Sequence, residues 1–252
     1  MKLPSIWLTA ILARVISKLV RSIPRPISKY ILNTVLDPIN FVEFAPPILV
    51  SPLGKWLAAN SRGNPLLSDL GCSSSDVYLL LGAFQGNSIL AFAEEFPGCR
   101  VLAFEPLPTA YDTAIQRCAS LKNVTILPLA VSAKDEVISL YPRGDATSQA
   151  ISPTNDTQSL SVMALGIDHV FRDYISDFED VVFEVNIEGG EYSVLQQLLD
   201  SVNILRLRTL LIQFHNVDES SELTRSSIRA RLRRTHRETF CFDWVWERWD
   251  RL

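Results

Sequence analysis

The sequence lacks the cysteine patterns that bind zinc or form a disulfide framework. Its four cysteines, Cys72, Cys99, Cys118 and Cys241, are scattered, with no C-x-x-C pair and no Cys/His spacing typical of a zinc site. We therefore expect no metal site, and free thiols in a reducing, cytoplasmic compartment. A chain of 252 residues is long enough to bury a core without such cross-links.

The sequence also lacks an apolar run that could span a bilayer. The most apolar N-terminal stretch is interrupted by Arg14, well short of the ~20 residues that a spanning helix needs. Charged residues recur through this stretch, and no small-residue cleavage site follows it. We therefore expect neither a transmembrane helix nor a secretory signal peptide.

Acidic residues are absent from residues 1–36, which carry six basic residues. Since the whole chain has a net charge of −4, the remainder carries −4 − 6 = −10. A body of this charge argues against a broad nucleic-acid surface, so we expect no nucleic-acid partner. The asymmetry instead predicts a basic arm on an acidic body.

The arm has the pattern of an amphipathic helix. Apolar residues recur at the i, i+3, i+4, i+7 spacing, at Leu8, Ile11, Leu12, Val15, Ile16, Leu19, Val20 and Ile23. Pro4 suits the start of the helix, and Pro24 and Pro26 end it. Two placements remain open. The helix packs on the protein's own body or on a second subunit, as in a homodimer, or residues 5–23 lie in the plane of a membrane on its inner, cytoplasmic face.

The chain is predicted to have three parts: the arm (1–36), a connector and cap (37–70) with a short helix around 52–61, and a body (71–252). The body alternates short apolar runs with helical periods, and it shows neither an internal repeat nor a low-complexity block. This alternation predicts an α/β, Rossmann-like doubly wound fold, with a mostly parallel sheet and helices on both faces. The expected strands are 77–83, 100–106, 123–131, 180–187 and 207–215, with an edge strand at 137–142 and β-like segments over 238–249. The expected helices are 87–97, 108–121, 191–202 and 221–235, with a long loop over 143–161 and a partly helical segment over 163–175.

The dinucleotide fingerprint G-x-G-x-x-G is missing, which argues against a nicotinamide dehydrogenase. A different glycine turn, LGAFQGNS (81–88), joins the first expected strand and helix, and Gly82 and Gly86 allow a tight turn close to a ligand. Glu105 ends the second expected strand, 23 residues after Gly82. An acid at about this separation hydrogen-bonds a ribose diol in folds of this kind, so we expect a nucleoside site.

Polar residues also gather at the end of another expected strand, in NIEGGEY (186–192). Strand alternation places Asn186 and Glu188 on one side, and Glu188 is the stronger candidate for chemistry. Glu191 has two explanations: a favourable charge in the first turn of a helix, or a role in contacting the substrate or a metal ion. His215 ends the fifth expected strand and is a candidate general base.

These motifs together resemble a known family. The order LGAFQGNS, VLAFEPLP, NVTILPLAVS, NIEGGEYSVL, LLIQFH and WVWERW is similar to that of the FkbM-type methyltransferases, over about residues 70–250. These are O-methyltransferases of the Rossmann-like class that use S-adenosylmethionine. The resemblance implies that this cofactor is bound by Gly82, Ala83, Gly86, Glu105, Ala130 and Val131. Together with their positions at strand ends, the resemblance leads us to expect catalytic roles for His215, Glu188 and Asn186, and a small-molecule or glycan acceptor.

Two positions depart from the family pattern. The family's first motif usually begins with Asp, as D-x-G-A, whereas this chain has Leu80 there. Asn186 stands where Asp is frequent, and an amide does not act as a base. We expect an O-methyltransferase acting on a hydroxyl of a glycan, glycolipid or secondary metabolite. The alternative is a methyltransferase-like binding or scaffolding protein, disabled at Leu80, at a membrane surface.

Overall fold

The computed structural model describes residues 51–61, 63–143, 146–148, 159–175 and 180–252. The predicted arm (1–36) and the first part of the connector lie outside these residues. The chain divides into two units, Met1–Ser68 and Asp69–Leu252. Within the described residues, no helix is both long and apolar enough to cross a membrane.

In the first unit, the structure describes one helix, α4 (Pro52–Asn60), where the connector was predicted to be helical. The hydroxyl of Ser51 caps it by accepting a hydrogen bond from the Gly54 N–H at 3.1 Å. Pro52 occupies the first helical position, where its missing N–H costs nothing.

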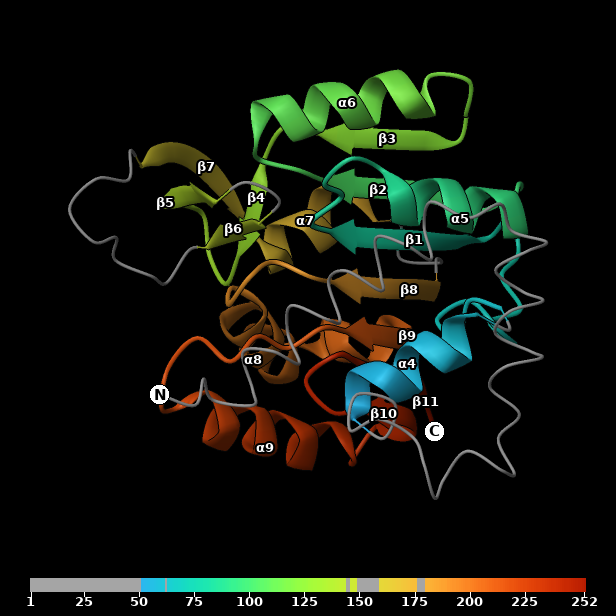
Figure 1. The fold of residues 1–252 in the computed structure, drawn as a ribbon. Helices are drawn as coiled ribbons and strands as arrows, with labels where there is room; N and C mark the ends of the chain where they lie inside the picture. Colours follow the sequence, from blue (N-terminus) through green and yellow to red (C-terminus); the bar gives the residue numbers. More distant parts are fainter. Residues whose placement is uncertain (1–50, 62, 144–145, 149–158, 176–179) are drawn as a thin grey trace, which may run out of the picture. The chain divides into compact units, whose positions relative to one another are not determined.

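The second unit is built on a seven-stranded sheet in the order β10-β11-β9-β8-β1-β2-β3 (Figure 1). Five neighbouring strands are parallel: β3, β2, β1, β8 and β9. The two C-terminal strands, β11 and β10, add an antiparallel edge. The bounds are β1 (Asp76–Leu81), β2 (Arg100–Phe104), β3 (Val124–Leu127), β8 (Asp180–Val185), β9 (Leu207–Ile212), β10 (His236–Phe242) and β11 (Trp246–Arg251). This architecture confirms the predicted Rossmann-like, mostly parallel sheet.

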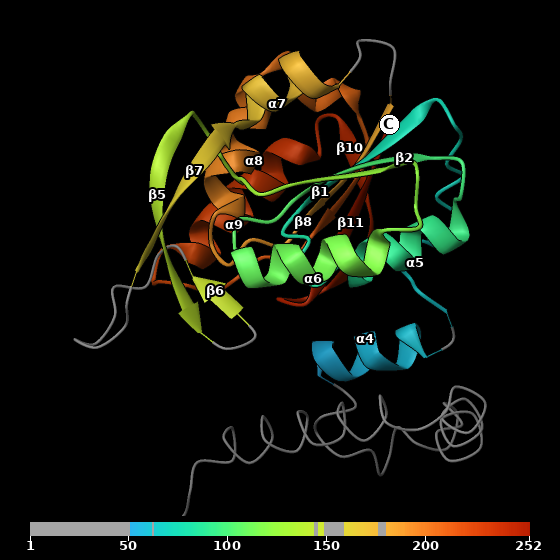
Figure 2. The ribbon, with the colours of Figure 1, turned by 90° about the horizontal axis from the view of Figure 1, so that it is seen from above.

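Helices cover both faces of this sheet (Figure 2). On one face lie α5 (Asn87–Glu95) and α6 (Pro108–Cys118). On the other lie α7 (Ile167–Tyr174), α8 (Glu191–Asp200) and α9 (Ser221–Leu232), with a short 3₁₀ turn, η1 (Val202–Arg206), after α8. Because both faces are covered, all six residues of β1 are buried, which explains its nearly continuous apolar sequence.

Alternation along β1 assigns its side chains to the two layers. Leu79 and Leu81 belong to the core that includes Val170 and Leu195 from α7 and α8. Tyr78 faces the other layer, where its ring stacks on Phe92 of α5 with centroids 4.0 Å apart. The position of a residue along β1 therefore decides which helical layer it contacts.

A second, four-stranded sheet in the order β4-β7-β5-β6 lies beyond the carboxyl ends of β1 and β2 (Figure 1). Its strands are β4 (Ala130–Ser132), β5 (Glu136–Arg143), β6 (Ala146–Ser148) and β7 (Leu160–Gly166). The predicted single strand 123–131 is wrong, because it divides into β3 and β4. Pro128 lies at the break and has no N–H to continue a ladder.

The predicted long loop over 143–161 is also wrong in part, because it contains β6 and the start of β7. The segment 163–175 was predicted to be partly helical. It begins as the end of β7 and becomes helical at Ile167, where α7 starts. The predicted edge strand 137–142 is β5, which pairs antiparallel with β7.

Candidate active site

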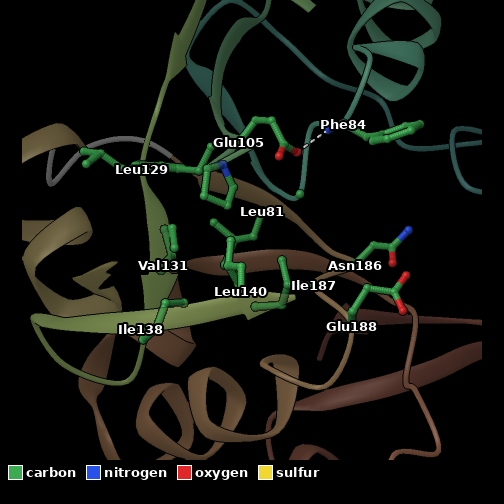
Figure 3. A pocket seen from close by; sticks show the side chains of 14 residues that line it. Leu81, Phe84, Glu105, Leu129, Val131, Ile138, Leu140, Asn186, Ile187 and Glu188 are labelled. Carbon is green, nitrogen blue, oxygen red and sulfur yellow. Dashed lines mark hydrogen bonds between the residues drawn. The ribbon is translucent and has the colours of Figure 1, made fainter. Parts of the chain in front are cut away.

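A cavity of about 830 Å³, counted with its open mouth, lies at the carboxyl ends of β1, β2 and β8 (Figure 3). The chain's topology reverses at this edge, since β1 is flanked by β2 on one side and β8 on the other. Ligands of open α/β sheets bind at such a switch point. The lining residues are Leu81, Gly82, Phe84, Phe104, Glu105, Pro106, Leu129, Ala130, Val131, Ile138, Leu140, Asn186, Ile187 and Glu188.

Gly82 brings two turns of the chain into close contact at the floor of this cavity. It has φ +89°, and a Cβ atom there would lie 2.1 Å from the backbone oxygen of Asn186. The N–H groups of Gly82 and Ala83 both donate to the Phe104 carbonyl at 3.0 Å. The β1–α5 turn is therefore fixed between the end of β2 and the β8–α8 turn, with no room for a side chain at Gly82.

Beyond Gly82, one residue of the predicted cofactor turn lines the cavity and others support the turn. Gly86 begins α5 with φ +80°, and a Cβ atom there would lie 3.1 Å from the Cys118 sulfur of α6. Within the described part of the chain, the cavity lining includes neither Gly86 nor the buried Ala83. Phe84 lines the cavity instead, with φ +46°. No sequence signal identified Phe84, because a phenylalanine in a turn has no characteristic pattern.

Glu105 is held rigidly beside this turn. It follows β2, which ends at Phe104, two residues before the end of the predicted strand 100–106. One carboxylate oxygen accepts the Phe84 N–H at 2.6 Å (Figure 3), and the other accepts the Leu107 N–H at 2.9 Å. Burial raises the pKa of Glu105, while these two N–H groups oppose that rise. A carboxylate oxygen has more than one acceptor site, so each oxygen of Glu105 can also accept a ligand hydroxyl.

The small sheet supplies an apolar wall to the cavity. Ala130 and Val131 of β4, which were predicted to bind the cofactor, line it. Ile138 and Leu140 of β5 join them, and the sequence did not identify these two. They alternate with period two, which shows that they share a face, but only the folding of β5 over the sheet edge brings that face to the cavity.

Asn186 and Glu188 lie side by side in the cavity, at the end away from Leu129 (Figure 3). The prediction placed them on one side by strand alternation, but β8 ends at Val185, so that argument does not apply. The backbone turns sharply instead, with φ +53° at Glu188 and φ +105° at Gly189. Positive φ at a glutamate is strained and is frequent at functional sites.

Glu191 and His215 form a buried support behind Glu188. Glu191 is fully buried, and its carboxylate accepts the Gly189 N–H at 2.9 Å and the His215 N–H at 2.8 Å. Glu191 lies in the first turn of α8, as its structural explanation expects, and its carboxylate also joins the β8–α8 turn to the segment after β9. His215 lies three residues beyond the end of β9 at Ile212, and not at the strand end as predicted.

The imidazole of His215 lies between two carboxylates. Nδ1 is 3.2 Å from a Glu191 oxygen, and Nε2 is 3.4 Å from a Glu188 oxygen. Burial alone would lower the pKa of His215, but its hydrogen bonds to Glu188 and Glu191, with their negative charges, outweigh burial and raise it to about 9. His215 is therefore protonated at neutral pH. Within the described residues, His215 is not one of those that line the cavity. Both observations disfavour a role as general base and favour one in positioning Glu188.

The raised pKa of His215 predicts a pH-dependent stability. Since the folded pKa exceeds the unfolded one, this stabilisation is fully present below pH ~6.5 and is lost as the pH rises through about 9. As the pH rises through this window, the wild-type protein should lose up to about 3 kcal/mol more unfolding free energy than the His215→Gln variant does. Urea denaturation of both proteins at several pH values measures this. If the unfolding free energies of the two proteins changed with pH in parallel, folding would not raise the pKa of His215.

Leu80, which stands where the family usually has Asp, is fully buried on β1. Its register partner on β8 is Glu184, so the two side chains share a face of the sheet. The Glu184 carboxylate accepts hydrogen bonds from the Tyr78 hydroxyl at 2.5 Å and from the Ser88 hydroxyl at 2.8 Å. Ser88 is the second residue of α5, whose cap residue, Gly86, has no side chain. A buried carboxylate therefore does lie beside the start of α5, where the helix dipole favours it, but it comes from β8.

Glu184 gives a stability prediction. Glu184→Ala leaves two buried hydroxyls without their acceptor, which should lower the unfolding free energy by roughly 2–4 kcal/mol. Glu184→Gln should lose less than about 1 kcal/mol, because its amide can accept from Tyr78 and donate to Ser88. Urea denaturation compares the two variants. Equal losses would show that the hydrogen bonds of Glu184 do not hold this part of the core.

The site therefore has three chemically distinct regions. Glu105 and the Gly82 turn suit a ribose, and the wall around Val131 and Ile138 suits a flat apolar ring. Asn186 and Glu188 present polar groups at the remaining side. No group of three His, Cys, Asp or Glu side chains suited to a metal ion occurs within the described residues.

Comparison with known proteins places this geometry among methyltransferases. The model of the methyltransferase FkbM domain matches residues 81–235, which is more than half of the chain. No curated protein matches the sequence.

Solved structures are similar to this chain at low sequence identity. Methyltransferase FkbM from Methylobacillus flagellatus KT is 17% identical, with a TM-score of 0.51 over 75% of this chain. The match covers 46% of that protein, so the present chain corresponds to about half of it. Fibrillarin from Aeropyrum pernix, solved with natively bound S-adenosyl-L-methionine, is 11% identical with a TM-score of 0.39, over 71% of this chain and 66% of that one. Methanococcus jannaschii fibrillarin is also 11% identical, with a TM-score of 0.43, over 71% and 67%.

Proposed function

Because the chain belongs to the FkbM methyltransferase domain family, we propose that it catalyses transfer of a methyl group from S-adenosylmethionine to a hydroxyl of a glycan, glycolipid or secondary metabolite. Binding of this cofactor is supported by one observation above all. The Glu105 carboxylate is fixed by the Phe84 and Leu107 N–H groups, next to the Gly82 turn, with acceptor sites left for a ribose diol.

The other cavity residues fit the remaining parts of such a ligand. Ala130, Val131, Ile138 and Leu140 form an apolar wall suited to an adenine ring. The turn at Gly82 lets the backbone approach the ligand closely, since it carries no side chain. This fit depends on residues from both sheets, so the small sheet is part of the proposed binding site.

Glu188 is the residue that we assign to the acceptor. A hydroxyl becomes strongly acidic as its oxygen forms a new bond to carbon, so a nearby carboxylate is a sufficient proton acceptor. Glu188 lines the cavity and is only partly exposed, while the His215 imidazolium, 3.4 Å away, orients it. Asn186 is proposed to hold the acceptor hydroxyl by hydrogen bonding, and positioning supplies much of the acceleration.

The test uses S-adenosylmethionine with a labelled methyl group and a panel of glycans, glycolipids and hydroxylated metabolites. We expect label in an acceptor as an ether, which survives mild alkaline hydrolysis, whereas a methyl ester would not. Glu188→Gln should slow transfer by roughly 10²–10⁴-fold with unchanged cofactor affinity. Cofactor binding without transfer to any acceptor would favour the alternative of a binding or scaffolding protein.

We also propose a peripheral membrane contact through residues 5–23, on the inner face of a membrane, supported only by the amphipathic and basic pattern of the sequence. Such a contact would favour a lipid-linked or surface-glycan acceptor. Liposome flotation of the full chain and of a chain without residues 1–26 tests it. Equal flotation of the two proteins would refute the contact.

A further inference from the structure

Two of the four thiols lie together at the amino-terminal edge of the large sheet. Cys72 precedes β1, and Cys99 directly precedes β2. The Cys99 thiol lies 3.2 Å from the Asp76 carbonyl oxygen, and the side chains of Cys72 and Cys99 interact strongly enough to shift each other's pKa. This edge is opposite the cavity, which lies at the carboxyl ends of the same strands (Figure 1).

The guanidinium of Arg208, on β9, holds this pair in place. One of its nitrogens lies 3.2 Å from the Cys72 sulfur and 3.4 Å from an Asp76 carboxylate oxygen. The other donates to the carbonyls of Leu70 and Gly71 at 2.9 and 3.2 Å. Several contacts therefore hold the Arg208 guanidinium beside the Cys72 sulfur.

These neighbours give the two thiols different characters. The hydrogen bond from Cys99 lowers the pKa of Cys72, burial opposes this, and the Arg208 charge lowers it further, while Asp76 raises it slightly. The same hydrogen bond, together with burial, raises the pKa of Cys99. Cys72 is half-buried and Cys99 is buried. The sulfur with the lowered pKa is thus the more accessible one, and the sulfur with the raised pKa is buried.

We propose that Cys72 and Cys99 form a dithiol site that reacts with hydrogen peroxide and closes to an intramolecular disulfide. The Cys72 thiolate attacks the peroxide, so that an S–O bond forms, the O–O bond breaks, and the leaving hydroxide takes a proton from solvent to become water. Cys99 then attacks the sulfenic acid of Cys72, forming the S–S bond and releasing a second water. The two thiols are oxidised, and one peroxide is reduced to two waters.

The remaining cysteines serve as internal controls. Burial raises the pKa of Cys118, and burial with the charge of Glu247 raises the pKa of Cys241. The Arg225 guanidinium lies 3.6 Å from the Cys241 sulfur, but within the described residues neither Cys118 nor Cys241 has a second thiol beside it. We therefore expect both to stay reduced while Cys72 and Cys99 react.

The experiment uses the full chain at pH 7 and needs no substitution for its first readout. Iodoacetamide alkylation, followed for each cysteine by mass spectrometry, should be about tenfold or more faster at Cys72 than at Cys241. After hydrogen peroxide, the thiols titrated in denaturant should fall from four to two, and peptide mapping should find Cys72 linked to Cys99. Equal alkylation rates, or thiol loss that maps to Cys118 or Cys241, would overturn the proposal.

Variants separate the roles of the two sulfurs and the cation. Cys99→Ser should leave a sulfenic acid at Cys72 that dimedone traps, whereas Cys72→Ser should leave Cys99 reduced. Arg208→Gln should slow alkylation of Cys72 to about the Cys241 rate, and Arg208→Lys, which keeps the charge, should slow it less. A sulfenic acid at Cys99 in place of Cys72 would contradict the assignment. Because the site is distant from the cavity, the oxidised protein should keep its affinity for S-adenosylmethionine.

Discussion

Glu105→Ala is expected to weaken S-adenosylmethionine binding by roughly a hundredfold or more. The carboxylate of Glu105 is the only charged acceptor that we assign to the ribose, and each hydrogen bond to a charged group contributes about 1.5–3 kcal/mol. Loss of two such bonds corresponds to at least ~3 kcal/mol, or about two orders of magnitude in affinity. The alanine also removes the acceptor of the Phe84 and Leu107 N–H groups, so the Gly82 turn loses part of its support.

Calorimetry with S-adenosylmethionine measures this effect. Glu95→Ala is the matched control, since Glu95 is an exposed glutamate at the end of α5, away from the cavity lining. We expect the control to bind as the wild-type protein does. Wild-type affinity in Glu105→Ala would refute the assignment of Glu105 to the ribose, even if the protein binds the cofactor.

Gly82→Ala is expected to lower the unfolding free energy by about 3 kcal/mol or more and to disrupt cofactor binding. Its Cβ atom would lie 2.1 Å from the Asn186 oxygen, so the β1–α5 and β8–α8 turns must move apart. Overpacking of this kind costs about 1–3 kcal/mol, and the positive φ of +89° adds about 1–2 kcal/mol for a residue with a side chain. Both turns carry cavity residues, so their separation should change the site as well as the stability.

Gly98→Ala is the control for this substitution. Gly98 precedes β2, and a Cβ atom there would meet nothing within 4 Å. Urea denaturation of both variants, followed by titration with S-adenosylmethionine, separates the local clash from a general glycine effect. If Gly82→Ala were as stable as Gly98→Ala and bound the cofactor normally, the close approach of the two turns would have no role in the site.

The large sheet was predictable because its signals are local. Buried strands such as β1 read as continuous apolar runs, and glycine or proline marks the turns that follow them. The spacing between Gly82 and Glu105 follows from the length of one strand–helix–strand unit, so these two residues could be placed together before the structure was known. The structure shows them on neighbouring turns of the same cavity.

The rest of the site depends on contacts between distant segments, which no local pattern encodes. Ile138 and Leu140 reach the cavity only because β5 pairs with β7 beyond the sheet edge. Glu184 reads as a charge within an apolar strand, and its role appears only when β8 lies beside β1. His215 seemed a suitable base from its position alone. Its pKa is set by Glu188 and Glu191, which approach it from another strand–helix turn.

The central claim is that this cavity binds S-adenosylmethionine although Leu80 replaces the usual acid. Calorimetric titration of the full wild-type chain with this cofactor tests it most directly. We predict saturable binding of one cofactor per chain, lost in Glu105→Ala and retained in Glu188→Gln. No detectable heat of binding at millimolar cofactor would contradict the account, since the protein would then be a methyltransferase fold without a functioning cofactor site.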